Sequence, residues 1–346
     1  MANVLAGKVI LVTGGSGSIG SELVSQALEK GARKVIVFSR DEIKHFMMRK
    51  NIPDNRLETV VGDIRDLKSI EQVFSRFDIE IIYHAAAMKH VVMCEEFPLE
   101  SVKTNILGIQ NIVDLALKYK VSKMIAISTD KAAYPVNVMG ATKFIAERIT
   151  LNANKFSEGK QSLSCVRFGN VANSRGSVIP VYIDSLVNHK LLQVSDPEVT
   201  RFIIELSDTV RLITKVTEYA QGGENFILKM KAFKLGELVD VMINSIAPRL
   251  NISKDDIRID MSGLVTGEKL NEDLINATES SRIYELDDMY VVLPNNELSE
   301  KYPSISKVSL SRYTSSDVEL ISKEEIERII LKYLETNGDY KDFTIL

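Results

Sequence analysis

Thr129, Asp130 and Lys131 place a hydroxyl, a carboxyl and an amine side by side at the end of an apolar run, residues 123–128. A carboxyl and an amine are side chains that act as general acid and general base in proton transfer. Lys143 follows in a helical pattern, and Met139 shares its helix face. Asp130 as a turn cap and Lys131 as a solvated loop residue explain the same residues equally well. The pattern alone therefore leaves proton chemistry and a structural turn both open.

A glycine-rich segment, residues 13–20, follows an apolar run at 8–13 and opens a helical pattern at 18–30. Its glycines permit a tight turn, close approach of a diphosphate and close packing of helix on strand, while the helix N-terminus offers unpaired N–H groups. The preceding strand and the following helix favour dinucleotide binding over an ordinary turn. The predicted contacts of this segment are Gly14, Ser16, Gly17, Ser18, Ile19 and Gly20.

The second apolar run, residues 34–38, is followed by Ser39 and Arg40 rather than by an acid. An acid about 20 residues beyond the glycine loop usually holds the ribose 2′-hydroxyl of NAD, whereas a guanidinium matches the 2′-phosphate of NADP. We therefore expect NADP as the cofactor, with NAD as the alternative because Asp41 and Glu42 follow directly. Residues after the next two strands complete the predicted cofactor site: Asp63, Ile64, Ala85 and Ala86.

These candidate residues follow short apolar runs that alternate with helix-length amphipathic stretches. The runs lie at residues 8–13, 34–38, 57–61, 79–83, 123–128 and 162–168. Such alternation predicts an α/β fold, a Rossmann-like doubly wound parallel sheet over residues 1–180 that binds ligands at the carboxyl ends of its strands. Beyond residue 180 the alternation loosens, which predicts a smaller C-terminal α/β substrate-binding domain over residues 181–346. No linker separates the two domains, so we expect some exchange of elements between them.

Composition argues against several classes of protein. Of the 346 residues 45% are hydrophobic and the net charge is -4, so we expect no surface for nucleic acid or for an anionic membrane. No apolar run reaches the ~18 residues needed to cross a bilayer, and Lys8 comes too early for a signal peptide. We expect a cytoplasmic protein. Cys94 and Cys165 lie in apolar stretches, where buried thiols are commoner than disulfides or metal ligands, so no metal site is expected.

Several longer motifs carry a resemblance to a known family. They are FSRDE at 38–42, GDIRD at 62–66, HAAAMKH at 84–90, STDKAA at 128–133, RFGNV at 167–171 and SRGSVIP at 174–180. With them the chain resembles the extended short-chain dehydrogenase/reductases and, more closely, the bacterial UDP-N-acetylglucosamine 4,6-dehydratases of polysaccharide biosynthesis. The resemblance covers roughly residues 5–335. It implies an NADP-dependent enzyme that oxidises C4 of the sugar, eliminates water across C5 and C6, and returns the hydride to C6.

The resemblance also implies roles for individual residues. Lys131 would remove the C5 proton, Asp130 would protonate the departing C6 hydroxyl, and Thr129 would hydrogen-bond near the reacting hydroxyl. Lys143 would hold the nicotinamide ribose, and Asn105 would belong to the supporting network. The residues that complete the implied cofactor site are Ser128, Lys143 and Val171.

Met139 departs from the pattern of the wider superfamily, which carries a catalytic tyrosine there. A thioether neither gives nor takes a proton, so the acid–base work falls to Asp130 and Lys131. Tyr134 offers a phenol nearby, but Pro135 follows it and its register differs from that of position 139. We therefore expect Tyr134 to pack or to line the substrate site.

A UDP-sugar carries two phosphates and a uracil, so its site should offer cations and amides. The resemblance assigns this binding to Lys89, Asn170, Arg175, Arg201 and Glu268. Relatives usually carry Gly-x-Arg-Pro-Gly-Glu-Lys, whereas residues 263–269 are GLVTGEK. Val265 thus replaces the arginine that meets the diphosphate. Either Lys269 or another cation compensates, or the diphosphate is held more weakly.

Two other functions stay open. A nucleotide-sugar epimerase on the same scaffold also oxidises C4 but returns the hydride there, and a non-catalytic NADP-binding protein would have lost activity at Met139. Asp130 and Lys131 favour the dehydratase, because a 4-epimerase needs no acid at C6. Phe168 favours retention of configuration at C5, because inverting relatives more often carry tyrosine there. We also expect a homo-oligomer.

Overall fold

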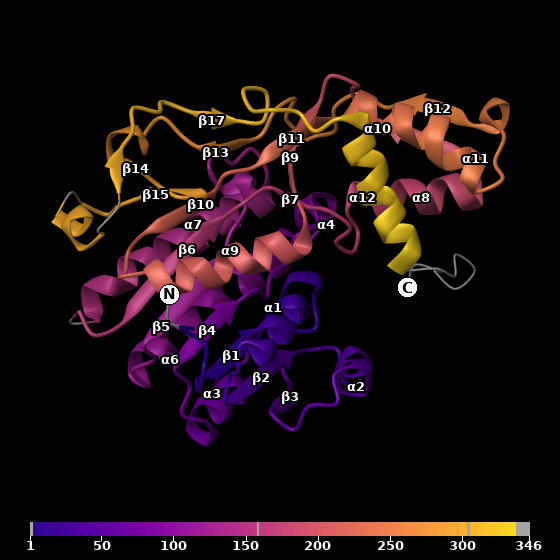
Figure 1. Ribbon diagram of the computed structural model, residues 1–346. Helices are drawn as coiled ribbons and strands as arrows, with labels where there is room; N and C mark the ends of the chain where they lie inside the picture. The colour runs from indigo at the N-terminus through magenta and orange to yellow at the C-terminus, as the bar shows by residue number, and fades with distance from the viewer. Residues whose placement is uncertain (1–2, 158, 296, 303–304, 337–346) are drawn as a thin grey trace. The chain divides into compact units, whose positions relative to one another are not determined.

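The computed structural model describes residues 3–157, 159–295, 297–302 and 305–336 (Figure 1). The chain forms two compact units that interleave along its length. Unit 1 comprises residues 1–168, 207–229 and 274–312, and unit 2 comprises residues 169–206, 230–273 and 313–346. Residues 207–229 and 274–312 therefore belong to unit 1, although they follow residue 180, where the sequence places a single domain boundary.

Unit 1 is built around a sheet that has ten strands in the described residues. Their spatial order is β16 (Ser306–Lys307), β14 (Ile283–Leu286), β15 (Met289–Val292), β10 (Asn225–Leu228), β6 (Ser162–Arg167), β5 (Lys123–Ile127), β4 (Ile81–His84), β1 (Val9–Thr13), β2 (Lys34–Ser39) and β3 (Leu57–Val61). The pairs from β10 to β3 are parallel, whereas β15 runs antiparallel to β10 and β14. The predicted Rossmann-like doubly wound sheet is confirmed.

Helices cover both faces of this sheet because its central strands are apolar on both sides. Leu11, Ile82 and Ile112 belong to a core on one face, which α3 (Leu67–Arg76), α6 (Gly108–Lys118) and α7 (Val138–Ala153) cover. On the other face the Tyr83 hydroxyl lies 2.8 Å from Thr217 Oγ1 of α9 (Leu206–Tyr219). Figure 1 shows α9 and α1 (Ser18–Glu29) on the near side of the sheet. The remaining helices of unit 1 are α2 (Glu42–Asn51), α4 (Val91–Glu96), α5 (Pro98–Ser101) and the π-helix Val102–Leu107.

Unit 2 combines small sheets with four α-helices in its described residues. Its strands are β7 (Asn170–Val171), β9 (Thr200–Ile204) and β11 (Lys231–Lys234) in one sheet, β8 (Leu191–Val194) with β12 (Arg258–Met261) in a second, and the short β17 (Tyr313–Thr314). β13 (Asp273–Ile275) begins at the last residue of one stretch of unit 2 and continues into unit 1. The helices are α8 (Val178–His189), α10 (Leu235–Val241), α11 (Ala247–Arg249) and α12 (Lys323–Thr336). Buried residues such as Ile183, Leu192 and Ile330 join them in one core.

Candidate active site

The glycine-rich loop joins β1 to α1. Gly14 has φ +68°, and a side chain there would lie 2.7 Å from the backbone of Ala86. A side chain on Gly20 would lie 2.3 Å from the Gly14 carbonyl oxygen. Gly17 caps α1 without a side-chain hydrogen bond, and the first turn of α1 carries no acid. Close approach therefore requires glycine at 14 and 20, and the N-terminus of α1 keeps its positive dipole end for an anion.

Ser39 and Arg40 lie at the carboxyl end of β2. Ser39 Oγ lies 2.8 Å from Ser16 Oγ of the glycine-rich loop. The Arg40 side chain is 60% exposed and lies 3.9 Å from Asp63 Oδ2, which Arg65 contacts more closely at 2.6 Å. Burial raises the pKa of Asp63, but hydrogen bonds from Arg65 outweigh burial and hold the pKa below its usual value. Arg40 therefore presents an exposed guanidinium that suits a further anion such as a 2′-phosphate.

The other predicted cofactor residues differ in their surroundings. Ala85 and Ala86 follow β4 half-buried, and the Ala85 N–H donates to the Thr13 carbonyl at 3.0 Å. Ile64 is 5% exposed and belongs to the core of unit 1. A side chain on Gly108 would lie 2.6 Å from Ile64 Cδ1, so the two segments are in close contact. The two alanines border the glycine-rich loop, whereas the Ile64 side chain packs in the hydrophobic core of unit 1.

Asp130 begins a 3-10 turn, Asp130–Ala132, just beyond the carboxyl end of β5. Its side chain is buried, with 0% of the residue exposed. Asp130 Oδ1 accepts hydrogen bonds from Thr129 Oγ1 at 2.7 Å, the Lys131 N–H at 2.8 Å and Lys131 Nζ at 3.1 Å. Oδ2 is buried and has no hydrogen-bond partner among the described residues. Because Oδ1 already accepts three donors, a proton carried by this carboxyl belongs on Oδ2.

The first turn of α7 packs directly on the catalytic turn, the name used below for residues 128–134. A side chain on Gly140 would lie 2.4 Å from the Lys131 carbonyl oxygen, so only glycine fits there. The Asn137 side chain caps α7 by accepting the Gly140 N–H at 2.7 Å. Met139 is 5% exposed, and Lys143 is buried on the same helix. The sulfur of Met139 therefore fills space inside unit 1 rather than facing solvent.

Lys143 points toward the end of β5. Its Nζ donates to the Ile127 carbonyl at 2.6 Å. Burial lowers the pKa of Lys143, and the Cys165 thiol and the Glu147 carboxylate oppose that shift. Burial also lowers the pKa of His84, at the end of β4, to about 3, so His84 is neutral at physiological pH. Lys143 is therefore a buried amine whose carbonyl partner gives it one fixed position beside the catalytic turn.

Asn105, on the π-helix, joins three parts of unit 1. Its side chain accepts the Met88 N–H at 2.8 Å, donates to the Met88 carbonyl at 3.0 Å and donates to Thr142 Oγ1 at 3.0 Å. Thr142 Oγ1 in turn donates to the Met139 carbonyl at 2.9 Å. This geometry links the segment after β4 to α7, as a supporting network would. Its catalytic importance stays a prediction.

Glu147 and Arg167 were not predicted to matter for the site. Ser128 Oγ donates to Glu147 Oε1, and Arg167 Nη2 lies 2.7 Å from Glu147 Oε2. All three residues are at least nine-tenths buried. The usable signals were a lone arginine at the end of a β-strand and a glutamate one helical turn beyond Lys143. Ser128, predicted to bind the cofactor, thus has its hydroxyl engaged by Glu147.

Unit 2 holds a pocket of about 250 Å³ that brings together three of the predicted substrate residues. Arg201 is held by Glu268 at 2.8 Å and by the carbonyls of Thr200 and Leu270 at 2.9 and 3.1 Å. Burial raises the pKa of Tyr182 to about 12, with Glu268 adding to the shift. The lining residues are Asn170, Val178, Tyr182, Gln193, Ser195, Val199, Arg201, Phe233, Leu235, Ser262 and Glu268. Aromatic rings, amides and one guanidinium suit a heteroaromatic ligand that carries anionic groups.

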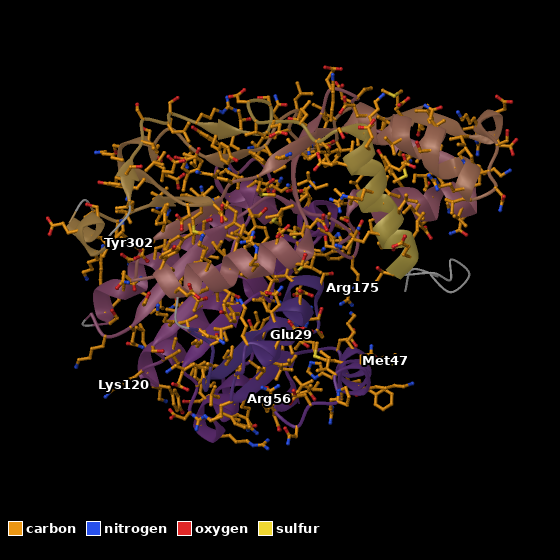
Figure 2. All side chains as sticks on the ribbon, viewed as in Figure 1. Glu29, Met47, Arg56, Lys120, Arg175 and Tyr302 are labelled. Carbon is orange, nitrogen blue, oxygen red and sulfur yellow. The ribbon has the colours of Figure 1, made fainter. Side chains whose placement is uncertain are left out.

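Lys89 and Arg175, also predicted to bind substrate, are exposed. Lys89 belongs to unit 1 and Arg175 to unit 2. Figure 2 labels Arg175, whose side chain projects away from the ribbon of its loop. Val171, a predicted cofactor residue, is 5% exposed in β7 of unit 2. Neither cation belongs to the lining of the unit 2 pocket.

The loop that carries Val265 follows β12. Val265 is 51% exposed. Lys269, the predicted compensating cation, lies 3.8 Å from Glu272 and 3.5 Å from Asp273, both of which are buried. These two carboxylates already balance the charge of Lys269. The position of Lys269 therefore does not favour it as the replacement for the missing arginine.

Tyr134 ends the catalytic turn. Its hydroxyl accepts the Ala277 N–H at 2.7 Å, and the side chain is partly exposed. The phenol thus contacts a distant segment of unit 1. This geometry agrees with a packing role and gives no support to Tyr134 as a substitute for the missing catalytic tyrosine.

A family model described as "Polysaccharide biosynthesis protein" matches residues 10–294. The chain belongs to this family. It is 37% identical to a UDP-N-acetylglucosamine 4,6-dehydratase (inverting) of Campylobacter jejuni, with 87% of each chain covered. It is 35% identical to a UDP-glucose 4-epimerase of Rickettsia rickettsii, covering 94% of this chain and 95% of that protein. The relatives of this chain therefore include both a dehydratase and an epimerase at similar identity.

Two further proteins that are similar to this chain carry no named activity. An uncharacterized membrane protein of Methanocaldococcus jannaschii is 39% identical over 95% of this chain and 97% of its own length. The X-ray structure of Pen from Bacillus thuringiensis superposes with a TM-score of 0.86 at 36% identity, covering 95% of this chain and 98% of that chain.

Among the residues that the structure describes, no helix is both long and apolar enough to span a bilayer.

Proposed function

We propose that this member of the family is an NADP-dependent UDP-N-acetylglucosamine 4,6-dehydratase. The observation that carries the proposal is the Asp130 carboxyl beside Lys131, buried, with Oδ2 left without a partner in the described structure. Elimination of water requires one group that removes the C5 proton and another that protonates the departing C6 oxygen. A 4-epimerase needs no acid at C6.

The pair reaches the required protonation states by a single transfer. Lys131 Nζ lies 3.1 Å from Asp130 Oδ1, and one proton given up by the ammonium and taken up by the carboxyl on Oδ2 leaves the total charge of the pair unchanged. The products are a neutral amine, which takes the C5 proton, and a carboxylic acid, which protonates the leaving hydroxyl. Met139 takes no part because a thioether exchanges no proton.

The residues around the glycine-rich loop fit NADP. The loop and the N-terminus of α1 would hold the diphosphate, and exposed Arg40 would hold the 2′-phosphate. When bound, NADP supplies the acceptor and later the donor of the hydride. Lys143, with its depressed pKa and fixed position, would hold the nicotinamide ribose.

The unit 2 pocket supports the nucleotide part of the proposal. Tyr182 and Phe233 offer rings, and Asn170, Arg201 and Glu268 offer hydrogen bonds. We place the UDP portion of the substrate on this pocket. Lys89 and Arg175, both exposed, are proposed as further diphosphate contacts.

The experiment that tests the proposal follows product mass after incubation with UDP-N-acetylglucosamine and NADP. Loss of one water supports the dehydratase. An isomer of unchanged mass would establish the epimerase that the Rickettsia relative favours, and unreacted substrate would leave a cofactor-binding protein. NMR of the product fixes the configuration at C5, for which Phe168 predicts retention, whereas the Campylobacter relative is named as inverting.

The cofactor assignment has its own test. Calorimetric titration should show tighter binding of NADP than of NAD, and Arg40→Ala should remove most of that difference. Lys44→Ala is the matched control, because Lys44 is another cation of the same region and pairs with Asp41 at 2.6 Å. Equal affinity of the parent protein for both cofactors would reject the role of Arg40.

A further inference from the structure

A buried ionic cluster lies behind the catalytic turn. Arg167, at the end of β6, is 0% exposed and pairs with two carboxylates. It contacts Glu147 of α7 at 3.0 and 2.7 Å and Glu279 at 3.0 Å through both terminal nitrogens. Burial raises the pKa of Glu147, but Arg167 outweighs burial and keeps that pKa below its usual value. Glu147 is therefore ionised, and several charge-assisted bonds from Arg167 fix the cluster.

The cluster holds the beginning of the catalytic turn. Glu147 Oε1 accepts the hydrogen bond from Ser128 Oγ. Ser128 directly precedes Thr129 and Asp130, and its backbone N–H donates to the Val166 carbonyl at 2.7 Å. Hydrogen bonds thus fix both the backbone and the side chain of Ser128, the first residue of the catalytic turn.

Residues 274–279, named here the return segment, hold the other end of the turn. Asn276 Nδ2 donates to the Ala133 carbonyl at 2.9 Å, and the Ala277 N–H donates to the Tyr134 hydroxyl at 2.7 Å. The same segment is tied to the cluster, because Arg167 donates to the Leu274 carbonyl at 2.7 Å. A closed ring of hydrogen bonds therefore runs from Ser128 through the cluster and the return segment back to Tyr134.

We propose that the return segment is a positioning element for Asp130 and Lys131, and that Asn276 and Tyr134 are positioning residues of the reaction. This inference rests on the proposed dehydratase function. A single 3-10 turn has too few hydrogen bonds to hold its own shape. The ring holds this turn at both ends, which fixes Asp130 Oδ2 and Lys131 Nζ relative to a bound sugar. A displacement of about 1 Å at such a site costs up to ~100-fold in rate.

The test compares Asn276→Ala and Tyr134→Phe with two controls in unit 1. Asn154 also uses its side chain to hold a distant backbone, accepting the Leu163 N–H at 3.0 Å and donating to the Leu163 carbonyl at 2.7 Å. The Tyr219 hydroxyl bonds Asp287 at 2.7 Å. Asn154→Ala and Tyr219→Phe therefore remove comparable bonds away from the turn. Each protein is measured for kcat, KM, NADP affinity and hydrogen exchange of the amides of residues 129–134.

We expect Asn276→Ala to lower kcat ~10- to 100-fold and Tyr134→Phe by a smaller factor, with KM and NADP affinity within about twofold of the parent. Exchange of the turn amides should rise in both variants and in neither control. The inference is overturned if Tyr134→Phe and Asn276→Ala both keep the kcat of the parent and its hydrogen exchange at the turn amides. It is also overturned if the two control variants lose as much kcat as the two test variants. If Asn276→Ala fails to fold, Tyr134→Phe decides. Absence of water loss in the parent refutes the proposed function, whereas the exchange data still decide whether the ring holds the turn.

Discussion

Met139 and Val265 are both apolar residues at positions where the wider superfamily or the related dehydratases carry a polar side chain, yet the structure treats them differently. Met139 is 5% exposed in the packed first turn of α7, whereas Val265 is 51% exposed in a loop of unit 2. The neighbouring Leu264 is also 45% exposed. Met139 therefore packs inside unit 1, whereas Val265 contributes little to packing. In the proposed mechanism Asp130 and Lys131 do the proton transfer that Met139 cannot do, whereas no side chain at position 265 offers a positive charge.

The largest effect should come from the turn that compensates for Met139. Lys131→Ala and Asp130→Asn should each lower dehydration ~100- to 10,000-fold, because each removes a proton-transfer group. Lys131→Ala should still permit oxidation at C4, visible as absorbance of bound NADPH. With Asp130→Asn in deuterated water, the substrate recovered after the reaction should carry deuterium at C5 in place of hydrogen. If Lys131→Ala releases dehydrated product at close to the parent rate, Lys131 does not supply the proton transfer that Met139 lacks.

Binding cations should show the next largest effect. Arg175→Ala and Lys89→Ala should each raise KM for UDP-N-acetylglucosamine about 10- to 100-fold, because a charge-assisted hydrogen bond contributes roughly 1.5–3 kcal/mol. NADP affinity, measured by calorimetry, should not change. Unchanged steady-state kinetics in both variants would show that the diphosphate is bound elsewhere.

Restoring the missing charge should sharpen the comparison. Val265→Arg should lower KM for the UDP-sugar by up to about fivefold, because an exposed ion pair contributes roughly 0.2–1 kcal/mol. Leu264→Arg is the matched control, since it adds the same charge at the neighbouring exposed position. An equal decrease in KM for both variants would indicate general electrostatic attraction rather than a specific contact.

Met139→Leu should have the smallest effect. The side chains have similar volumes, and a buried exchange of this kind usually costs less than about 1.5 kcal/mol of stability. We expect kcat within about twofold of the parent and a small shift in Tm measured by calorimetry. A dead but folded Met139→Leu protein would mean that the thioether has a role in the reaction.

The sequence predicted the parallel part of the large sheet well. Its strands are apolar runs bounded by turns, and the structure places β1 to β6 on the predicted runs within about two residues at each end. Asp130 and Lys131 could be placed beside the ligand crevice because the carboxyl ends of parallel strands share one edge. The pairing of β10 with β6 and β15 was not predicted, because nothing in a short strand specifies a distant partner.

The contacts behind the site were equally hidden from sequence. Glu147, Arg167 and Glu279 lie far apart along the chain, and their spacing follows no periodicity of helix or strand. Arg167 gave the stronger of the two signals, since an arginine at the end of a buried strand needs a charged partner. Which partner it takes depends on the tertiary fold.

The return segment also sets the order in which a growing chain acquires its properties. The glycine-rich loop and the residues of the catalytic turn leave the ribosome early, but β6 remains an open sheet edge until residues 225–228 are made and pair with it. Asn276 and Glu279 follow still later. A nascent chain can therefore contain the whole glycine-rich loop before the ring of hydrogen bonds around Asp130 and Lys131 has closed. If the proposed dehydratase function holds, an unfinished chain would present its glycine-rich loop before Asp130 and Lys131 are held in place for proton transfer.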